Sequence, residues 1–230
     1  MPAEDAASGH YDLVLEWAGD ILQLHDLRTP RARPVFVDIA RVRPLPKRGP
    51  FAQAVGRKTR TVVDATAGLG GDTLRLAAMG YRVTAVERTP VIAALLEDGL
   101  VRLRPRLKPD IVPPPVLHVG DAAAYLRTLR EPPDCVYLDP MFPPKRRDSA
   151  LAAKEMRLLR DLGGDDEDAA GLFDAASASG TARVVVKRPD HAPPLMPAPD
   201  HHFAGKLVRY DVYLRKPGGN YQGDDRNSRG

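Results

Sequence analysis

The chain has 230 residues, of which 43% are hydrophobic and 28% charged, as expected for one globular domain or for one domain with a small appendage. A single cysteine, Cys135, excludes an internal disulfide, and no apolar run approaches the roughly 20 residues of a membrane span. The acidic start MPAEDAASGHYDL lacks the apolar core of a signal peptide, so we expect a cytoplasmic location.

The net charge of +4 is unevenly distributed along the chain. Residues 28–60 contain ten Lys or Arg against one acid, Asp38, which indicates either a solvated surface or a surface for a phosphate backbone. We expect three parts: a basic N-terminal extension or small subdomain over 1–56, a main domain over 57–216, and a mobile tail over 217–230.

The N-terminal part gives mixed signals. Residues 11–27 have a periodicity that fits either two short strands or a helix. Residues 34–44 alternate apolar and polar positions, which predicts a strand with Arg41 and Arg43 on one face. Residues 44–56, with Lys47 and Arg48, predict a turn-rich connection into a short helix.

From residue 60 the pattern becomes regular. Strands are predicted over 61–66, 81–87, 116–120 and 135–140, and helices over 72–79, from Thr89-Pro90 to about 103, and over 122–129. Asp72 fits an N-cap and Gly80 a C-terminal stop of the first of these helices. This alternation predicts an α/β fold with a doubly wound, mostly parallel sheet and helices on both faces.

The remaining elements extend this pattern. A helix over 149–162 and an acidic loop precede a small-residue helix around 169–179. A strand over 182–189, a proline-rich break over 191–199 and a last strand over 206–216 then complete the predicted sheet.

Acids and glycines lie where the predicted strands end. Ligands bind open α/β sheets at the carboxyl ends of the strands, so these residues are expected to gather around one site. They are Asp64, Gly68, Gly70 and Gly71 after the first strand, Glu87 after the second, Gly120 and Asp121 after the third, and Asp139 after the fourth.

The glycine loop DATAGLGGD lacks the G-x-G-x-x-G spacing of dinucleotide sites, and Asp64 would repel a diphosphate. The same acid would attract the sulfonium of S-adenosylmethionine. Glu87, 23 residues after Asp64, suits both ribose hydroxyls, and Asp121 suits the adenine amine. Each acid alone could be a strand-end cap, but the set favours S-adenosylmethionine over NAD.

Five stretches carry a more specific resemblance. In order along the chain, VVDATAGLGGD, AVERTPVIAALLEDGL, VYLDPMFPPK, ALAAKEMRLLRDL and RVVVKRPDHAPPL resemble the RsmJ family, the ribosomal RNA small subunit methyltransferases J. The resemblance runs from about Pro34 to Leu214 and implies a Rossmann-like class I methyltransferase fold that methylates the N2 amine of a guanine in 16S rRNA. It also implies that the cofactor is contacted by Gly71, Asp72, Glu87, Arg88, Gly120, Asp121 and Asp139. The chain departs from the family pattern at Gly71 and at Gly120-Asp121, where backbone contacts would persist, and in the shortened basic loop PKRGPFAQAV.

The segment DPMF resembles the [DN]-P-P-[FY] segment of amino-methyltransferases. The Asp139 carboxylate and the Pro140 carbonyl are candidate acceptors for the hydrogens of the target amine. Phe142 is a candidate platform for an extruded base. No His/Cys cluster has metal-ligand spacing, so we expect no metal.

Basic residues follow this segment and end a later strand. With a base pocket beside them, we favour contacts with the phosphates of 16S rRNA or the small ribosomal subunit over plain surface charge. The candidates are Lys145, Arg146, Lys154, Arg157, Lys187 and Arg188, together with Arg41, Arg43, Lys47 and Arg48. The alternatives are an amino-methyltransferase for another RNA or DNA base, and a non-enzymatic RNA-binding or assembly factor with a relic cofactor site.

Overall fold

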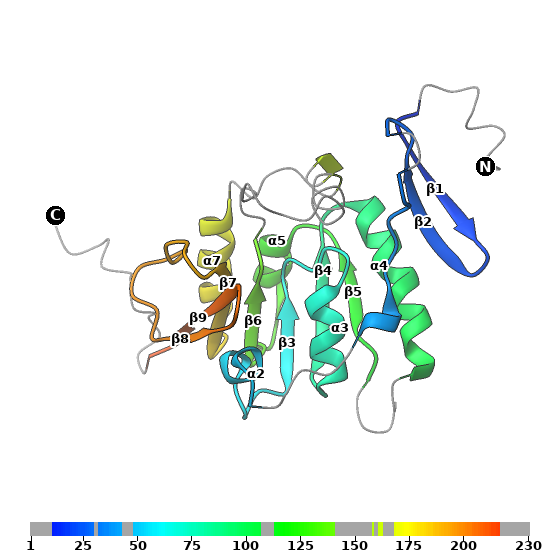
Figure 1. Ribbon diagram of the computed structural model, residues 1–230. Helices are drawn as coiled ribbons and strands as arrows, with labels where there is room; N and C mark the ends of the chain where they lie inside the picture. Colours follow the sequence, from blue (N-terminus) through cyan, green and yellow to red (C-terminus); the bar gives the residue numbers. More distant parts are fainter. Residues whose placement is uncertain are drawn as a thin grey trace.

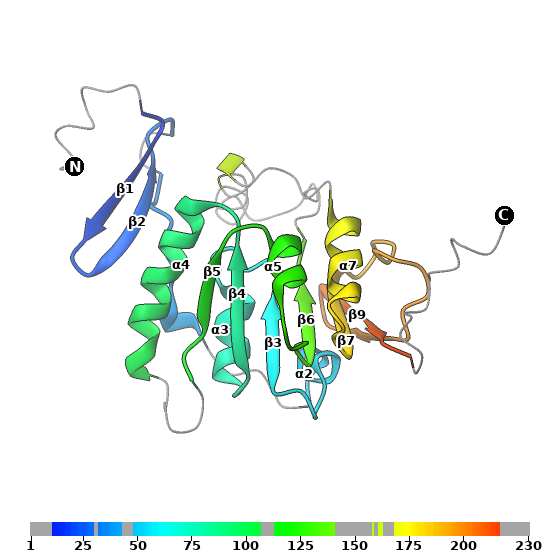
Figure 2. The same ribbon diagram turned by 180° about the vertical axis from the view of Figure 1, so that it is seen from behind.

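The computed structural model describes residues 11–29, 32–42, 48–106, 113–140, 158, 161–162 and 168–216, and shows a central sheet covered by helices (Figures 1 and 2). The strands are β1 (Leu13–Ala18), β2 (Ile21–Asp26), β3 (Thr61–Asp64), β4 (Arg82–Glu87), β5 (Val116–Val119), β6 (Cys135–Leu138), β7 (Arg183–Pro189), β8 (His201–Ala204) and β9 (Val208–Leu214). The α-helices are α2 (Pro50–Val55), α3 (Gly71–Ala78), α4 (Pro90–Leu103), α5 (Ala122–Thr128) and α7 (Ala169–Ala178).

The main sheet has seven strands in the order β5-β4-β3-β6-β7-β9-β8. Strands β3 to β7 pair in parallel, and β9 is antiparallel to both of its neighbours. The chain winds outward from β3 through β4 to β5, then crosses back to β6 and β7. The order therefore reverses between β3 and β6, which confirms the predicted doubly wound, Rossmann-like class I fold.

Helices α2, α3 and α4 cover one face of the sheet, and α5 and α7 cover the other (Figures 1 and 2). Strand β6 is buried on both faces, which explains its continuous apolar sequence CVYL. Val136 and Leu138 pack in the cluster that contains Phe173 of α7. Tyr137 points to the other face, where its ring meets Phe51 of α2 edge-on at 5.5 Å between centroids.

Residues 11–27 form two strands, not a helix. β1 and β2 pair as an antiparallel hairpin around Gly19, which has φ +61°. Leu22 and Leu24 are buried in one cluster with Leu95, Leu96 and Leu100 of α4. The hairpin is tied to that helix by Asp98, whose Oδ2 accepts the backbone N–H of Leu22 at 3.3 Å.

The predicted strand over 34–44 is largely wrong. Among its described residues, only Val35 pairs, as an isolated antiparallel bridge to Leu24. Ile39–Arg41 form a 3₁₀ helix in which the Asp38 carboxylate accepts the N–H of Ala40. The apolar alternation serves a different purpose, since Val35, Val37 and Ile39 are buried in the cluster with α4 instead of joining the sheet.

Two further predictions need correction. Strand β8 lies directly after the predicted proline-rich break and was not expected. Gly70, not Asp72, is the N-cap of α3, and Asp72 lies in the first turn of that helix with its side chain buried. Gly80 does follow the end of α3 with φ +99°, as a C-terminal stop requires.

Some predicted segments lie outside the described residues. These are the tail 217–230 and, apart from residues 158 and 161–162, the helix 149–162. No helix in the described part of the chain is both long and apolar enough to cross a bilayer.

Candidate active site

A cleft opens at the carboxyl ends of β3, β4, β5 and β6, with α7 along one side. Its empty volume, including open solvent at the mouth, is about 860 Å³. It is lined by Ala65, Thr66, Gly68, Val86, Glu87, Arg88, Thr89, Ile92, Gly120, Asp121, Ala122, Ala123, Asp139, Asp168, Ala169 and Leu172.

The glycine loop forms one wall of this cleft. Gly68 and Gly70 have φ values of +53° and +78°, which other residues adopt only with strain. A side chain at Gly70 would also overlap Leu96 of α4. The two glycines therefore let the chain turn sharply after β3 while α3 packs closely against α4.

Glu87 lies at the end of β4 and is only 8% exposed. Its Oε2 accepts the backbone N–H of Gly68 at 2.9 Å, and its Oε1 accepts that of Thr89 at 2.8 Å. Because a carboxylate offers about four acceptor positions, both oxygens retain capacity for the two hydroxyls of a ribose. Glu87 thus fixes the loop and keeps the capacity to bind a ligand.

Asp121 caps helix α5 on the opposite wall. Its Oδ1 accepts the N–H of Ala124 at 2.7 Å, and the preceding Gly120 donates its N–H to the Glu87 carbonyl at 2.9 Å. The apolar side chains of Val86, Ile92 and Leu172 lie between these polar walls. Such a mixture of apolar surface and fixed carboxylates suits a nucleoside.

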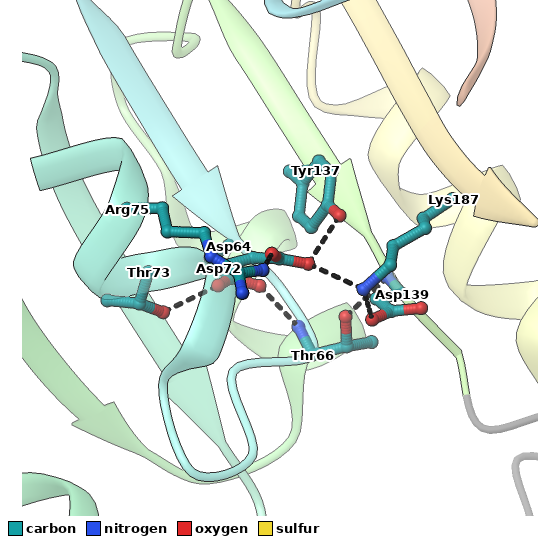
Figure 3. A network of polar contacts seen from close by, with 8 residues as sticks. All are labelled: Asp64, Thr66, Asp72, Thr73, Arg75, Tyr137, Asp139 and Lys187. Atoms are coloured by element: carbon teal, nitrogen blue, oxygen red, sulfur yellow. Dashed lines mark hydrogen bonds and ion pairs between the residues drawn. The ribbon is translucent and has the colours of Figure 1, made fainter. Parts of the chain in front are cut away.

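Asp139 follows β6 and lines the cleft. Its backbone N–H donates to Thr66 Oγ1 at 2.6 Å, and its Oδ2 accepts a charged hydrogen bond from Lys187 Nζ at 2.6 Å (Figure 3). Lys187 also donates to Asp72 Oδ2 at 2.8 Å, and this oxygen accepts the Tyr137 hydroxyl at 2.7 Å. Strands β6 and β7 and helix α3 are therefore joined behind the cleft.

For Lys187 and Asp72, the neighbouring charges outweigh burial in setting the pKa. Burial acts to lower the pKa of Lys187, but the charges of Asp139 and Asp72 outweigh it and raise that pKa. Burial acts to raise the pKa of Asp72, yet Lys187 and the hydrogen bonds around it hold the value below its ordinary range. For Tyr137, burial and the charge of Asp72 act together and raise the pKa well above 10. Lys187 and Asp72 are therefore a charged pair at neutral pH.

Asp64, at the end of β3, is 1% exposed and does not line the cleft. Its Oδ2 accepts the Thr73 hydroxyl at 2.5 Å and its Oδ1 the N–H of Thr66 at 3.3 Å. Burial raises its pKa to about 7, and the charges of Asp72 and Asp139 add to that rise. The carboxyl group braces the glycine loop from behind, and its predicted cofactor contact stays a prediction.

Comparisons with known proteins agree with this geometry. Residues 5–215 match the family described as "Putative SAM-dependent methyltransferase". The ribosomal RNA small subunit methyltransferase J of Pectobacterium atrosepticum is 44% identical over 211 residues, covering 84% of this chain and 83% of the relative. The protein of the same name from Dechloromonas aromatica is 42% identical, covering 91% of both chains. This chain belongs to the ribosomal RNA small subunit methyltransferase J family.

A solved methyltransferase structure is similar to this chain over most of its length. The SAM-dependent methyltransferase NGO1261 from Neisseria gonorrhoeae aligns with a TM-score of 0.70 and 34% identity, covering 92% of this chain and 86% of that one. The cofactor of the methyltransferase is S-adenosylmethionine, and the cleft fits it. Glu87, Asp121 and Asp139 all line it, and their predicted contacts with the ribose, the adenine and the sulfonium stay predictions.

The structure gathers some of the predicted cofactor residues and separates others. Six line the cleft, namely Gly68, Glu87, Arg88, Gly120, Asp121 and Asp139, whereas Asp64, Gly70, Gly71 and Asp72 shape the loop and helix behind it. Pro140 is buried directly after Asp139, and Phe142 lies outside the described residues. Cofactor and catalytic roles for these residues remain predictions.

Three features of the site were not anticipated. Thr66 anchors the backbone of Asp139, Tyr137 bonds Asp72, and α7 contributes Asp168 and Leu172 to the cleft. Thr66 follows Asp64 by two residues in a turn, a position where a hydroxyl often bonds the backbone. Nothing in the sequence pairs α7 with the loops after β3 and β4.

The predicted phosphate contacts fall into three groups. Arg43, Lys47, Lys145, Arg146, Lys154 and Arg157, and the side chain of Arg41, lie outside what the structure describes. Arg48 is exposed but lines a second cleft, at the amino ends of β3 and β4. Lys187 is engaged by Asp72 and Asp139, and Arg188 is 6% exposed with its Nε bonded to the Pro193 carbonyl at 2.9 Å. Both side chains have partners inside the fold, and their predicted phosphate role stays a prediction.

Among the described residues, no group of three His, Cys, Asp or Glu side chains is arranged to hold a metal ion.

Proposed function

We propose that this chain transfers a methyl group from S-adenosylmethionine to the exocyclic N2 amine of a guanine in 16S rRNA. One observation carries the proposal: Asp139 lines the cofactor cleft, with its backbone N–H bonded to Thr66 and its carboxylate bonded to Lys187. The relatives named as small subunit ribosomal RNA methyltransferases support the choice of substrate.

The chemistry calls for an acceptor at this position. When bound, the cofactor supplies an electrophilic methyl group on a sulfonium. The guanine N2 lone pair is delocalised into the ring, so the amine must be drawn toward tetrahedral geometry. Hydrogen bonds from the amine to the Asp139 carboxylate and the Pro140 carbonyl would do this and would stabilise the positive charge that develops on nitrogen.

Positioning would supply much of the remaining rate. A base held within van der Waals contact of the methyl group needs no further search for orientation. Phe142, two residues after Pro140, is proposed to stack on the extruded base. A cytoplasmic location follows from the proposed substrate.

Mass mapping of methylated guanines in rRNA tests the proposal directly. Cells that lack this protein should lose one N2-methylguanine from 16S rRNA and regain it on complementation with the wild-type gene, but not with Asp139→Ala. Loss of a methyl group from another base would favour the broader amino-methyltransferase class. An unchanged methylation map together with a ribosome assembly defect would favour the non-enzymatic alternative.

A further inference from the structure

Lys187 reaches the site from β7, a strand with no residue in the cleft lining described above. It projects from β7, and its Nζ bridges Asp139, at the end of β6, to Asp72, in the first turn of α3 (Figure 3). The distances of 2.6 Å and 2.8 Å are those of strong charged hydrogen bonds. The side chain is 21% exposed, so solvent screens the pair only weakly.

The two carboxylates differ in their surroundings. Asp72 is 8% exposed and also contacts Arg75 Nη1 at 2.9 Å and the Tyr137 hydroxyl. Asp139 is more exposed, at 35% of its side chain, and lines the cleft. Lys187 therefore ties the acid that faces the ligand to an acid fixed in the scaffold.

The charges of this network nearly balance. Asp72 and Asp139 contribute two negative charges, Lys187 and Arg75 two positive charges, and Asp64 is a third acid whose pKa is raised to about 7 by burial. Removing the lysine alone would leave excess negative charge beside the cleft. Removing Lys187 and the charge of Asp72 together would restore the balance but not the bridge.

We propose that Lys187 is a positioning residue that fixes the Asp139 carboxylate toward the target amine and sets the charge of the wall that faces the sulfonium. The positioning role rests on the proposed methyl transfer to an amine. The charge role rests only on the cofactor. In the transfer itself, the bond from sulfur to the methyl carbon breaks with its electrons left on sulfur, a bond from nitrogen to carbon forms, and the amine proton leaves to solvent.

The two roles can be separated with three variants. Lys187→Met removes the charge and keeps a long side chain, Lys187→Arg keeps the charge, and the double variant Asp72→Asn with Lys187→Met restores the charge balance without the bridge. Lys206→Met is the matched control, because Lys206 is exposed in the turn between β8 and β9. Thermal unfolding of each variant reports whether it is folded.

Binding is measured first, by calorimetry with S-adenosylmethionine and with S-adenosylhomocysteine, which lacks the positive charge. In Lys187→Met the preference for the charged ligand should rise about three- to tenfold over wild type, and it should return toward wild type in the double variant. An unchanged preference in Lys187→Met, or one that stays raised in the double variant, overturns the charge role.

Activity is measured second, on 16S rRNA and small subunits. Lys187→Met and the double variant should both lose about 10²-fold in kcat, with KM for RNA changed less than about threefold, because a misaimed acceptor slows the chemical step. Lys187→Arg should regain part of the rate, and Lys206→Met should match wild type. A Lys187→Met enzyme with kcat within about threefold of wild type overturns the positioning role.

These results are distinct from failure of the proposed function. If the wild-type protein methylates no rRNA guanine, the proposed function and the positioning role both fail. The binding preference still decides the charge role, since it needs no RNA. If the wild-type protein is active and the Lys187 variants match the Lys206→Met control, the proposed function stands and this inference alone fails.

Discussion

Strand β3 has an aspartate near each end, and the pKa values of the two carboxyl groups are shifted in opposite directions. At the amino end, Asp134 Oδ2 accepts the backbone N–H groups of Arg60 and Thr61 at 2.7 Å and 3.0 Å. Burial acts to raise its pKa, but these hydrogen bonds outweigh burial and lower it. At the carboxyl end, burial prevails and raises the pKa of Asp64 to about 7.

The two ends of β3 also differ in the charged residues around them. Four exposed arginines, at positions 48, 57, 60 and 82, line the second cleft at the amino end, and within the described residues their side chains make no ion pair. At the carboxyl end, acids are buried and share cations within the fold. A carboxylate at the amino end therefore stabilises the sheet, whereas the carboxyl end concentrates costly charge where a ligand binds.

The strongest test of this contrast is Asp139→Ala. We expect a loss on the order of 10³-fold in methyl transfer, since the acceptor aimed at the amine is removed. Binding of S-adenosylhomocysteine should be partly retained, because Glu87 and Asp121 are untouched. Methyl incorporation into rRNA and calorimetry measure the two effects, and full activity in this variant would refute the assigned chemistry.

Glu87→Gln should produce the next largest effect. An amide has a single oxygen, so it cannot accept the N–H groups of both Gly68 and Thr89 and still bind a ribose. We expect cofactor affinity to fall about 10- to 100-fold by calorimetry. Glu97→Gln on the exposed side of α4 is the control, and equal affinities for the two variants would contradict the role of Glu87.

Asp64→Asn tests the buried acid through pH. Between pH values of about 4 and 7, Asp64 is protonated in the folded state and ionised in the unfolded state. The stability that this proton provides is present at low pH and is lost as pH rises through 7. Urea denaturation should show a wild-type free energy of unfolding that declines over this window by roughly 1–3 kcal/mol more than that of the variant. Parallel pH profiles would mean that Asp64 titrates normally.

Asp134→Ala should have the smallest effect and a different signature. Losing the acceptor for two backbone N–H groups should lower the free energy of unfolding by about 1–2 kcal/mol. Cofactor binding should not change, because the site is at the opposite end of the strand. Denaturation together with calorimetry checks both, and weakened cofactor binding would show that the two ends are coupled.

The sequence was sufficient to predict the central strands of the sheet and many of the residues that line the cleft. Strands such as β6 are buried on both faces and read as continuous apolar runs. Gly68 follows β3 and Glu87 ends β4, and the carboxyl ends of these parallel strands must meet at one edge of the sheet. The alternating pattern around Val35 and Val37 led to a wrong strand prediction, because a segment packed along a helix can alternate apolar and polar residues in the same way as a strand.

Lys187 shows what a pattern of residue types cannot reveal. A basic residue near the end of a strand suggests a surface cation, and in the sequence it lies 48 residues from Asp139 and 115 from Asp72. Only the parallel pairing of β6 with β7, and the packing of α3 beside them, bring the three together. Its partners follow from tertiary contacts that no local signal encodes.

Gly99, in the middle of α4, gives the N-terminal segment an unexpected importance. A glycine inside a helix costs about 1 kcal/mol, and here it makes room for Val37, which any side chain at this position would strike. Helix α4 is thus grooved to receive residues 35–39. A shortened chain that begins after this segment would expose an apolar groove along α4, and copies of the chain would associate through it. A soluble truncated enzyme would therefore need that groove filled or made polar.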